Sequence, residues 1–166
     1  MTQLGLFGTI LGLAVWLGSV VFLTFYVTPL LTRRLGPGKA SEVLAVVNRW
    51  YFWQSWVCGV FMLAGGIGPL VGHPEQRATA LTFITLTALG IAVSLYGGLV
   101  VVPRANDLRD RLQGSAGAEE NLFVRDRFDH MNRVAIFLNG LVICLLAGAA
   151  LAMSFLFVPF DPPQGG

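Results

Sequence analysis

The most reactive side chains of this chain gather where its last apolar segment begins. His130 and Asp126 are one helical turn apart, so the carboxylate could hold an imidazole N–H group, as in metal and proton-transfer sites. Arg104, Asn48 and Asn139 complete a candidate polar cluster. The same spacing is typical of an ordinary solvated helix face, so both interpretations stay open.

Arg104 follows Pro103 directly, at the end of the third apolar segment. Its guanidinium could pair with Asp126 or Asp129 on a neighbouring helix, because arginine forms bidentate pairs with carboxylates. It could instead bind an anionic head group or substrate. We favour the ion pair, which would lock two helices together.

Sulfur atoms provide a second candidate site. Cys58 and Met62 are four residues apart, hence on one helical face, and Cys144 lies at a comparable depth in the last apolar segment. Thiolate and thioether ligands suit Cu(I) or another soft ion. Buried Cys and Met also serve as plain apolar filler, and there is no Cys-x-x-Cys motif.

Other cofactors and classical enzyme chemistry lack support in the sequence. The serines within apolar segments have no His and acid nearby, and no phosphate-binding loop is present. Haem would need a second histidine at matching depth, but His73 is expected on the opposite side of the membrane. We therefore expect no enzyme activity and no cofactor, with copper or another soft metal as the one exception the sulfur atoms allow.

The amino-acid composition is typical of a membrane protein. Hydrophobic residues make up 55% of the chain and charged residues only 12%, about half of the usual share in soluble domains. The net charge of +2 shows no concentrated basic face, so nucleic acid is not an expected partner. The lipid bilayer is the expected environment.

Four segments are long enough to cross a hydrocarbon core of about 30 Å as helices. None contains a charged residue or histidine, and their continuous apolar character excludes alternating barrel strands. They are Leu4–Leu31, Phe52–Val71, Ala80–Val102 and Val134–Phe157. We predict an all-α protein, a four-transmembrane-helix bundle forming one domain over residues 1–158, with a mobile Pro- and Gly-rich tail at 159–166.

The basic residues predict the orientation of this bundle. Ten of the eleven Lys and Arg residues lie between the first and second or the third and fourth segments, and Arg77 alone lies on the other side. Because short loops rich in Lys and Arg stay cytoplasmic, both termini should be extracytoplasmic. Ten arginines against a single lysine suggest a GC-rich genome, and a bacterial inner membrane is the default expectation, with an organelle membrane as the alternative.

Helical extensions are expected on the cytoplasmic side. Val124, Phe128, Met131 and Ala135 recur at helical spacing and form one apolar stripe leading into the fourth span. Asp107 and Arg111 are spaced for pairing on a helix that follows the third span. A helical hairpin should therefore project into the cytoplasm, and a further helix starting near Ser41 should precede the second span.

Rows of small residues mark the expected helix contacts, since small side chains let backbones approach closely in lipid. They are Gly8 and Gly12 in the first span, Gly90, Ser94 and Gly98 in the third, and Gly140, Cys144, Gly148 and Ala152 in the fourth. Packing within the chain is the favoured interpretation, and a homo-oligomer interface is the alternative.

The residues 16–25 (WLGSVVFLTF) and 30–37 (LLTRRLGP) resemble the first span of the transmembrane protein 205-like family, long labelled a domain of unknown function. A Pro-Arg pair after the third span and Phe128-Asp-His130 before the fourth agree with that family. The residues that carry the resemblance are Trp16, Gly18, Phe22, Phe25, Pro103, Arg104 and His130. More remotely, the layout is similar to CopD-like copper-resistance membrane domains. The resemblance implies tolerance of toxic metal compounds.

Two functions fit these features. The favoured one is a non-enzymatic accessory or scaffold component of a larger membrane assembly, because the spans are uncharged and site chemistry is sparse. The alternative is a transporter or tolerance factor for a metal ion or toxic small molecule, working through the polar cluster and the Cys58 face. Attraction of anionic lipids by the cytoplasmic loops is weaker, since acids are interleaved with the bases.

Overall fold

The computed structural model describes residues 3–72, 74–114 and 118–157, and every element within them is helical. The elements are α1 (Gln3–Phe22), the π-helical η1 (Leu23–Val27), α2 (Thr28–Gly72), the 3-10 helix η2 (Pro74–Gln76), α3 (Arg77–Tyr96), the π-helical η3 (Gly97–Val101), α4 (Val102–Gly114) and α5 (Ala118–Phe157). The predicted all-α class is confirmed. The proposed tail at 159–166 lies outside the described residues.

Four helical stretches are long and apolar enough to cross a membrane, as the sequence predicts. They are Gly5–Gly36, Glu42–Gly72, Pro74–Leu108 and Val124–Leu156. Each is longer than the predicted uncharged segment that it overlaps, mainly because the helix continues past the apolar residues at the end that carries most of the charges.

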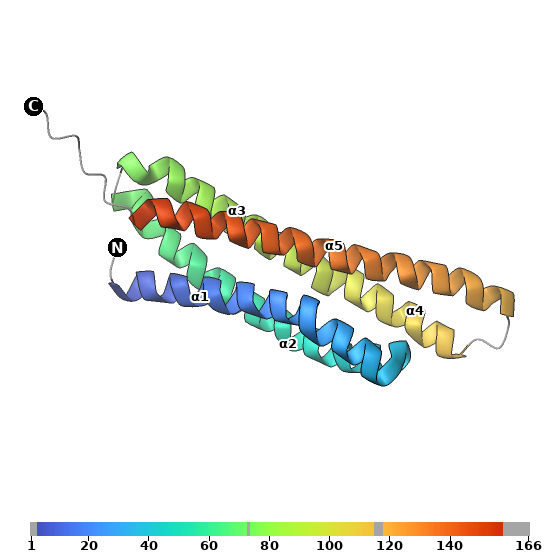
Figure 1. The fold of residues 1–166 in the computed structure, drawn as a ribbon. Coiled ribbons are helices and arrows are strands. Elements are labelled where there is room, and N and C mark those ends of the chain that lie inside the picture. The colour runs from blue at the N-terminus through green and yellow to red at the C-terminus, as the bar shows by residue number, and fades with distance from the viewer. Residues whose placement is uncertain (1–2, 73, 115–117, 158–166) are drawn as a thin grey trace, which may run out of the picture.

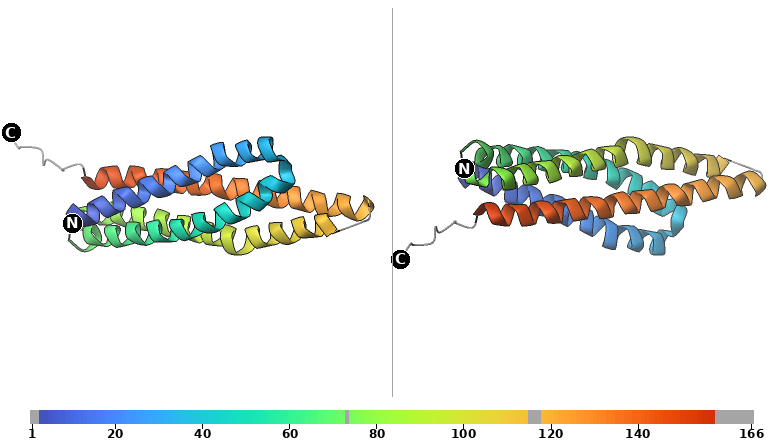
Figure 2. Two further views of the ribbon diagram at one scale, coloured as in Figure 1. Left: turned by 90° about the horizontal axis from the view of Figure 1, so that it is seen from below. Right: turned by 90° about the horizontal axis from the view of Figure 1, so that it is seen from above.

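The first two spans are joined by a sharp turn at Gly36. This residue interrupts α2 with φ 76° and ψ 163°, a backbone conformation that residues with a Cβ rarely adopt. The part of α2 before the turn continues the first span, and the part after it runs back alongside α1 (Figure 2). The helix expected to precede the second span is therefore continuous with that span.

The helices form a bundle in which α1 packs on α2, α2 on α3, and α3 on α5, with α1 also contacting α5 (Figure 1). Its centre contains the fully buried side chains of Trp16, Met62, Phe83 and Leu146. The N-terminal end of α1 and the C-terminal end of α5 lie at the same end of the bundle. This agrees with an even number of spans.

At the other end, α4 and the beginning of α5 extend beyond the turn at Gly36 (Figure 1). We call this part, residues 103–114 and 118–133, the hairpin. Val124, Phe128 and Met131 are half-buried while the charged residues around them are exposed, so the predicted apolar stripe is confirmed. Asp107 pairs with Arg111 at 3.1 Å on the exposed face of α4, as predicted.

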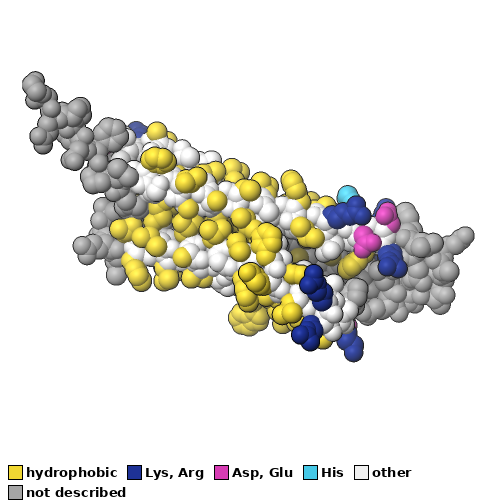
Figure 3. Space-filling model, viewed as in Figure 1, with side chains coloured by type: hydrophobic (Ala, Val, Ile, Leu, Met, Phe, Trp, Pro, Cys, Tyr) yellow, Lys and Arg dark blue, Asp and Glu magenta, His cyan; other side chains and the backbone are white. Residues whose placement is uncertain are grey.

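The outer surface matches a lipid environment. Large apolar side chains such as Phe7, Phe61, Ile136 and Phe155 are exposed along the length of the spans. On the face shown in Figure 3, hydrophobic side chains cover the bundle, and the charged side chains gather almost entirely toward the hairpin end. This distribution is compatible with a multi-pass membrane protein whose apolar belt faces lipid and whose charged end faces water.

Two π-helical segments interrupt the first and third spans, and sequence patterns did not predict either of them. In η1, the Thr28 hydroxyl donates to the carbonyl of Leu23 at 2.8 Å, which supports the wider turn. In η3, Gly97 and Gly98 begin the segment. Such bulges displace the side chains that follow them and often accompany functional sites.

Candidate functional site

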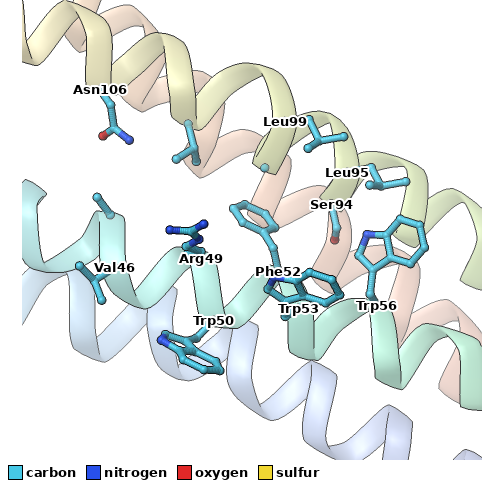
Figure 4. A pocket seen from close by; sticks show the side chains of 13 residues that line it. Val46, Arg49, Trp50, Phe52, Trp53, Trp56, Ser94, Leu95, Leu99 and Asn106 are labelled. Atoms are coloured by element: carbon cyan, nitrogen blue, oxygen red, sulfur yellow. The ribbon is translucent and has the colours of Figure 1, made fainter.

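A large groove runs along the bundle between α2 and the continuous helix formed by α3, η3 and α4. Its volume is about 1050 Å³, which is at the upper end of the range for small-molecule sites. We call it the α2–α3 groove. Its lining includes Ala45, Val46, Arg49, Trp50, Phe52, Trp53, Trp56, Ser94, Leu95, Gly98, Leu99, Val102 and Asn106 (Figure 4).

The polar groups of this groove are unevenly placed. Arg49 and Asn106 stand toward its charged end, whereas Trp56 and Leu95 line the part that lies deeper in the apolar belt (Figure 4). Arg49 is exposed and makes no ion pair within the described residues. The groove is therefore an apolar channel with an uncompensated cation at one end.

Behind the groove lies a second, much smaller space of about 40 Å³, which we call the polar cavity. Asn48, Tyr51, Ser94 and Asn139 contribute its polar lining, from α2, α3 and α5. Such a volume has room for about two or three water molecules. The cavity is the place where the structure brings polar side chains together between the spans.

Several polar atoms beside the polar cavity have no hydrogen-bonding partner. The Tyr51 hydroxyl lies within interaction range of the Ser55, Trp16 and Ser94 side chains. However, Tyr51 OH, Trp16 Nε1 and Ser94 Oγ are all buried without a bond of acceptable geometry. Buried polar groups without partners cost free energy, and lipid offers them none. Water in the polar cavity would satisfy those that reach it.

The ring of Phe52 forms part of the wall between the groove and the polar cavity, since it lines both. It lies flat on Gly98: a Cβ placed on that residue would be 2.8 Å from Phe52 Cγ. Only glycine permits so close an approach. Ser94 and Val102 also line both spaces, so the two are separated by single side chains.

The structure divides the polar cluster that the sequence suggested. Asn48 and Asn139 meet at the polar cavity. His130 and Asp126 are exposed on α5, and Arg104 is exposed on α4. The described residues contain no hydrogen bond or ion pair between any of these last three.

The predicted ion pair of Arg104 with Asp126 or Asp129 is wrong for this structure, where the described residues show no such pair. All three side chains are exposed, although α4 and α5 contact each other.

The sulfur residues do not form a common site. Cys58 and Met62 are both buried in the core, on the face of α2 that packs against α1, while Cys144 is exposed on α5. Within residues 3–72, 74–114 and 118–157, no three His, Cys, Asp or Glu residues come together in a group that could hold a metal ion. The Cys58 and Met62 side chains instead fill space in the bundle.

The small-residue rows serve close packing at most of the expected positions. A Cβ on Gly12 would be 3.1 Å from the Cys58 carbonyl oxygen, and one on Gly148 would be 3.2 Å from a methyl group of Leu86. Gly8 faces Phe61 and Gly90 faces Trp16 more loosely, at 3.9 Å and 3.5 Å, and Ser94 is buried. Gly140 has open space beside it.

The residues of the family resemblance occupy different environments. Trp16 is fully buried at the centre of the bundle, close to Gly90 and Gly59. Phe22 and Phe25 are exposed on the lipid-facing surface, and Gly18 has open space beside it. Pro103 is exposed at the start of the hairpin.

Sequence reasoning missed the groove and the polar cavity. The small-residue pattern placed Ser94 in a packing row, and that pattern does not indicate that its side chain meets Tyr51 across helices. The one available signal was the presence of hydroxyl and amide residues inside apolar segments, since each such group requires a partner in lipid.

A model of a domain of unknown function, DUF4149, matches residues 11–113. This range covers the first three spans, the α2–α3 groove and three helical turns of α4. No curated protein and no solved structure matches the chain. Because the match includes well over half of the sequence, the chain belongs to the DUF4149 family, whose function is undefined.

Proposed function

We propose that this protein is a non-enzymatic accessory component of a larger membrane assembly, and that its hairpin is the surface that contacts the assembly. The observation that carries this proposal is the extension of the hairpin beyond the turn at Gly36 (Figure 1). Two helices in contact with each other reach out from the rest of the bundle there.

The surface chemistry of the hairpin supports a protein partner. Exposed side chains of both signs alternate on α5: Arg125, Asp126, Arg127, Asp129, His130 and Arg133. Mixed charges give little net attraction to an anionic lipid surface, but they can match a complementary protein surface and set its register. The half-buried stripe that includes Val124 and Met131 holds these charges on a stiff scaffold.

Site-specific photocrosslinking in cells tests this role. A photoreactive amino acid replaces Asp129 on the hairpin or, as the matched control, Leu151, which is exposed toward lipid on the same helix. We expect one protein adduct of defined mass from position 129 and none from position 151. Charge reversal of Arg133 should weaken that adduct. Equal adducts at both positions, or no protein adduct at 129, would refute the proposal.

A second candidate function is transport or tolerance of a toxic metal compound or small molecule, as the resemblance to the transmembrane protein 205-like and CopD-like groups implies. The polar cavity favours it, because Asn48 and Asn139 place amide groups between the spans. Growth of a deletion strain on copper salts tests it. Wild-type protein should restore growth and Asn139→Leu should not; full complementation by Asn139→Leu would count against this role.

We also propose a location in a bacterial inner membrane with both termini outside the cytoplasm. The concentration of cations at the hairpin end supports this orientation, since short cationic segments remain cytoplasmic. The hairpin would then meet its partner in the cytoplasm.

A further inference from the structure

We infer that the α2–α3 groove is a binding site for one anionic membrane phospholipid, with an acyl chain in the groove and the phosphate at Arg49. The groove takes Asn106 from the base of the hairpin and is otherwise lined by residues 45–56 and 94–102, away from the exposed α5 charges on which the accessory role depends. The inference therefore stands or falls independently of that role. The proposed occupant is a lipid of the surrounding membrane.

The shape and lining of the groove fit an acyl chain. Its walls are predominantly aromatic and aliphatic, with Trp53, Trp56 and Leu99 exposed toward the space. The eight residues from Arg49 to Trp56 span about 10 Å at a helical rise of about 1.5 Å per residue, so the groove extends well into the hydrocarbon layer. A groove that opens to lipid in this way is accessible to the acyl chains around it.

The charge at one end selects among lipids. The Arg49 side chain projects from α2 toward the space between the helices, and Asn106 of α4 lies at the same end (Figure 4). Arg49 is not neutralised by any ion pair within the described residues. The phosphodiester of a lipid can accept two parallel hydrogen bonds from an arginine side chain. When the rest of the head group carries no positive charge, the lipid has a net negative charge, and Arg49 attracts it.

The level of Arg49 in the membrane agrees with this assignment. Trp50 and Trp53 flank it, with 74% and 68% of their side chains exposed. Exposed tryptophans mark the interface, where lipid phosphates lie. The arginine therefore stands at phosphate height while the groove below it stands at acyl-chain height.

Native mass spectrometry of the full-length protein tests the site. Protein in mild detergent is equilibrated with equal amounts of phosphatidylglycerol and deuterated phosphatidylcholine, and retained lipid is counted. We expect one retained lipid, with about fivefold preference for phosphatidylglycerol, the ratio equivalent to ~1 kcal/mol for one arginine near an anionic head group. Arg49→Gln should remove the preference, and Arg33→Gln, which removes an exposed cation from the same end, should retain it.

A groove-filling variant separates this site from loose surface lipid. Leu99→Trp places a larger ring in the groove and should reduce retention of both lipids, whereas Leu151→Trp, on a lipid-exposed face of α5, should not. Inorganic phosphate should not displace the lipid, because the acyl chain provides much of the binding. Equal retention of the two lipids by the wild type, or an unchanged preference in Arg49→Gln, would overturn the inference.

Discussion

Replacement of Gly65 by alanine should open the contact between α1 and α2. The added Cβ would overlap Thr9 Oγ1 and lie 3.0 Å from Thr9 Cβ. Thr9 has little freedom to move away, because its side chain is only 2% exposed and its hydroxyl donates to the Gly5 carbonyl at 2.9 Å. Because the χ1 angle of threonine is restricted in a helix, the Thr9 side chain has few other positions to adopt. The two helices must therefore separate locally.

The expected change in the free energy of unfolding is the sum of three contributions. Overpacking of this kind costs about 1–3 kcal/mol, and loss of the Thr9 hydrogen bond costs about 1 kcal/mol more. Alanine in a helix is favoured over glycine by about 1 kcal/mol, which offsets part of this cost. A net destabilisation of about 2 kcal/mol corresponds to a decrease in Tm of about 4–8 °C for a chain of this size.

Thermal unfolding in mild detergent, followed by circular dichroism, measures the effect. Gly140→Ala is the matched control, because no atom lies within 4 Å of its added Cβ and its Tm should stay constant or rise. In the Gly65→Ala background, Thr9→Ala removes the overlapping oxygen and should restore part of the lost stability. If Gly65→Ala is as stable as Gly140→Ala, or if Thr9→Ala restores nothing, the assignment of this contact is refuted.

Two further predictions concern orientation and metal content. In a background without native cysteines, Ala118→Cys should react with a membrane-impermeant maleimide only from the cytoplasmic side, because cations concentrate at the hairpin end. Labelling from outside would contradict the proposed orientation. The purified protein should bind copper below stoichiometric amounts, because Met62 is fully buried beside Cys58 and Cys144 is exposed on another helix. Elemental analysis of wild type, Cys58→Ala and Cys144→Ala checks this, and stoichiometric copper lost in Cys58→Ala would contradict it.

The elements of the fold were predictable because each depends on nearby residues. Uncharged apolar runs long enough to span lipid define the four spans, and all four are present. The periodic stripe of Val124, Phe128 and Met131 predicted the packed face of the hairpin for the same reason. The π-helical segments were not predictable in this way, since apolar residues such as those of η1 and η3 fit an uninterrupted helix equally well.

The candidate sites depended on which helix faces meet, and there the sequence was a weaker guide. Spacing along one helix placed His130 beside Asp126, but it could not show that both face solvent. The predicted pairing of Arg104 with an acidic residue is absent among the described residues, where Arg104, Asp126 and Asp129 are all exposed. Asn48 and Asn139 belonged to the predicted polar cluster, and their meeting at one cavity is a property of the bundle.

By itself, the sequence determined that the chain is helical, that it has four segments long and apolar enough to cross a membrane, and that its charges collect at one end. These properties follow from the free energy of moving apolar and charged groups between water and lipid, which is set residue by residue. Tertiary structure alone decided that Tyr51 and Ser94 meet beside a polar cavity and that Arg49 stands at the end of an apolar groove. Both features form between helices distant in sequence, because the close contact of Phe52 with Gly98 and of Gly65 with Thr9 sets how those helices pack.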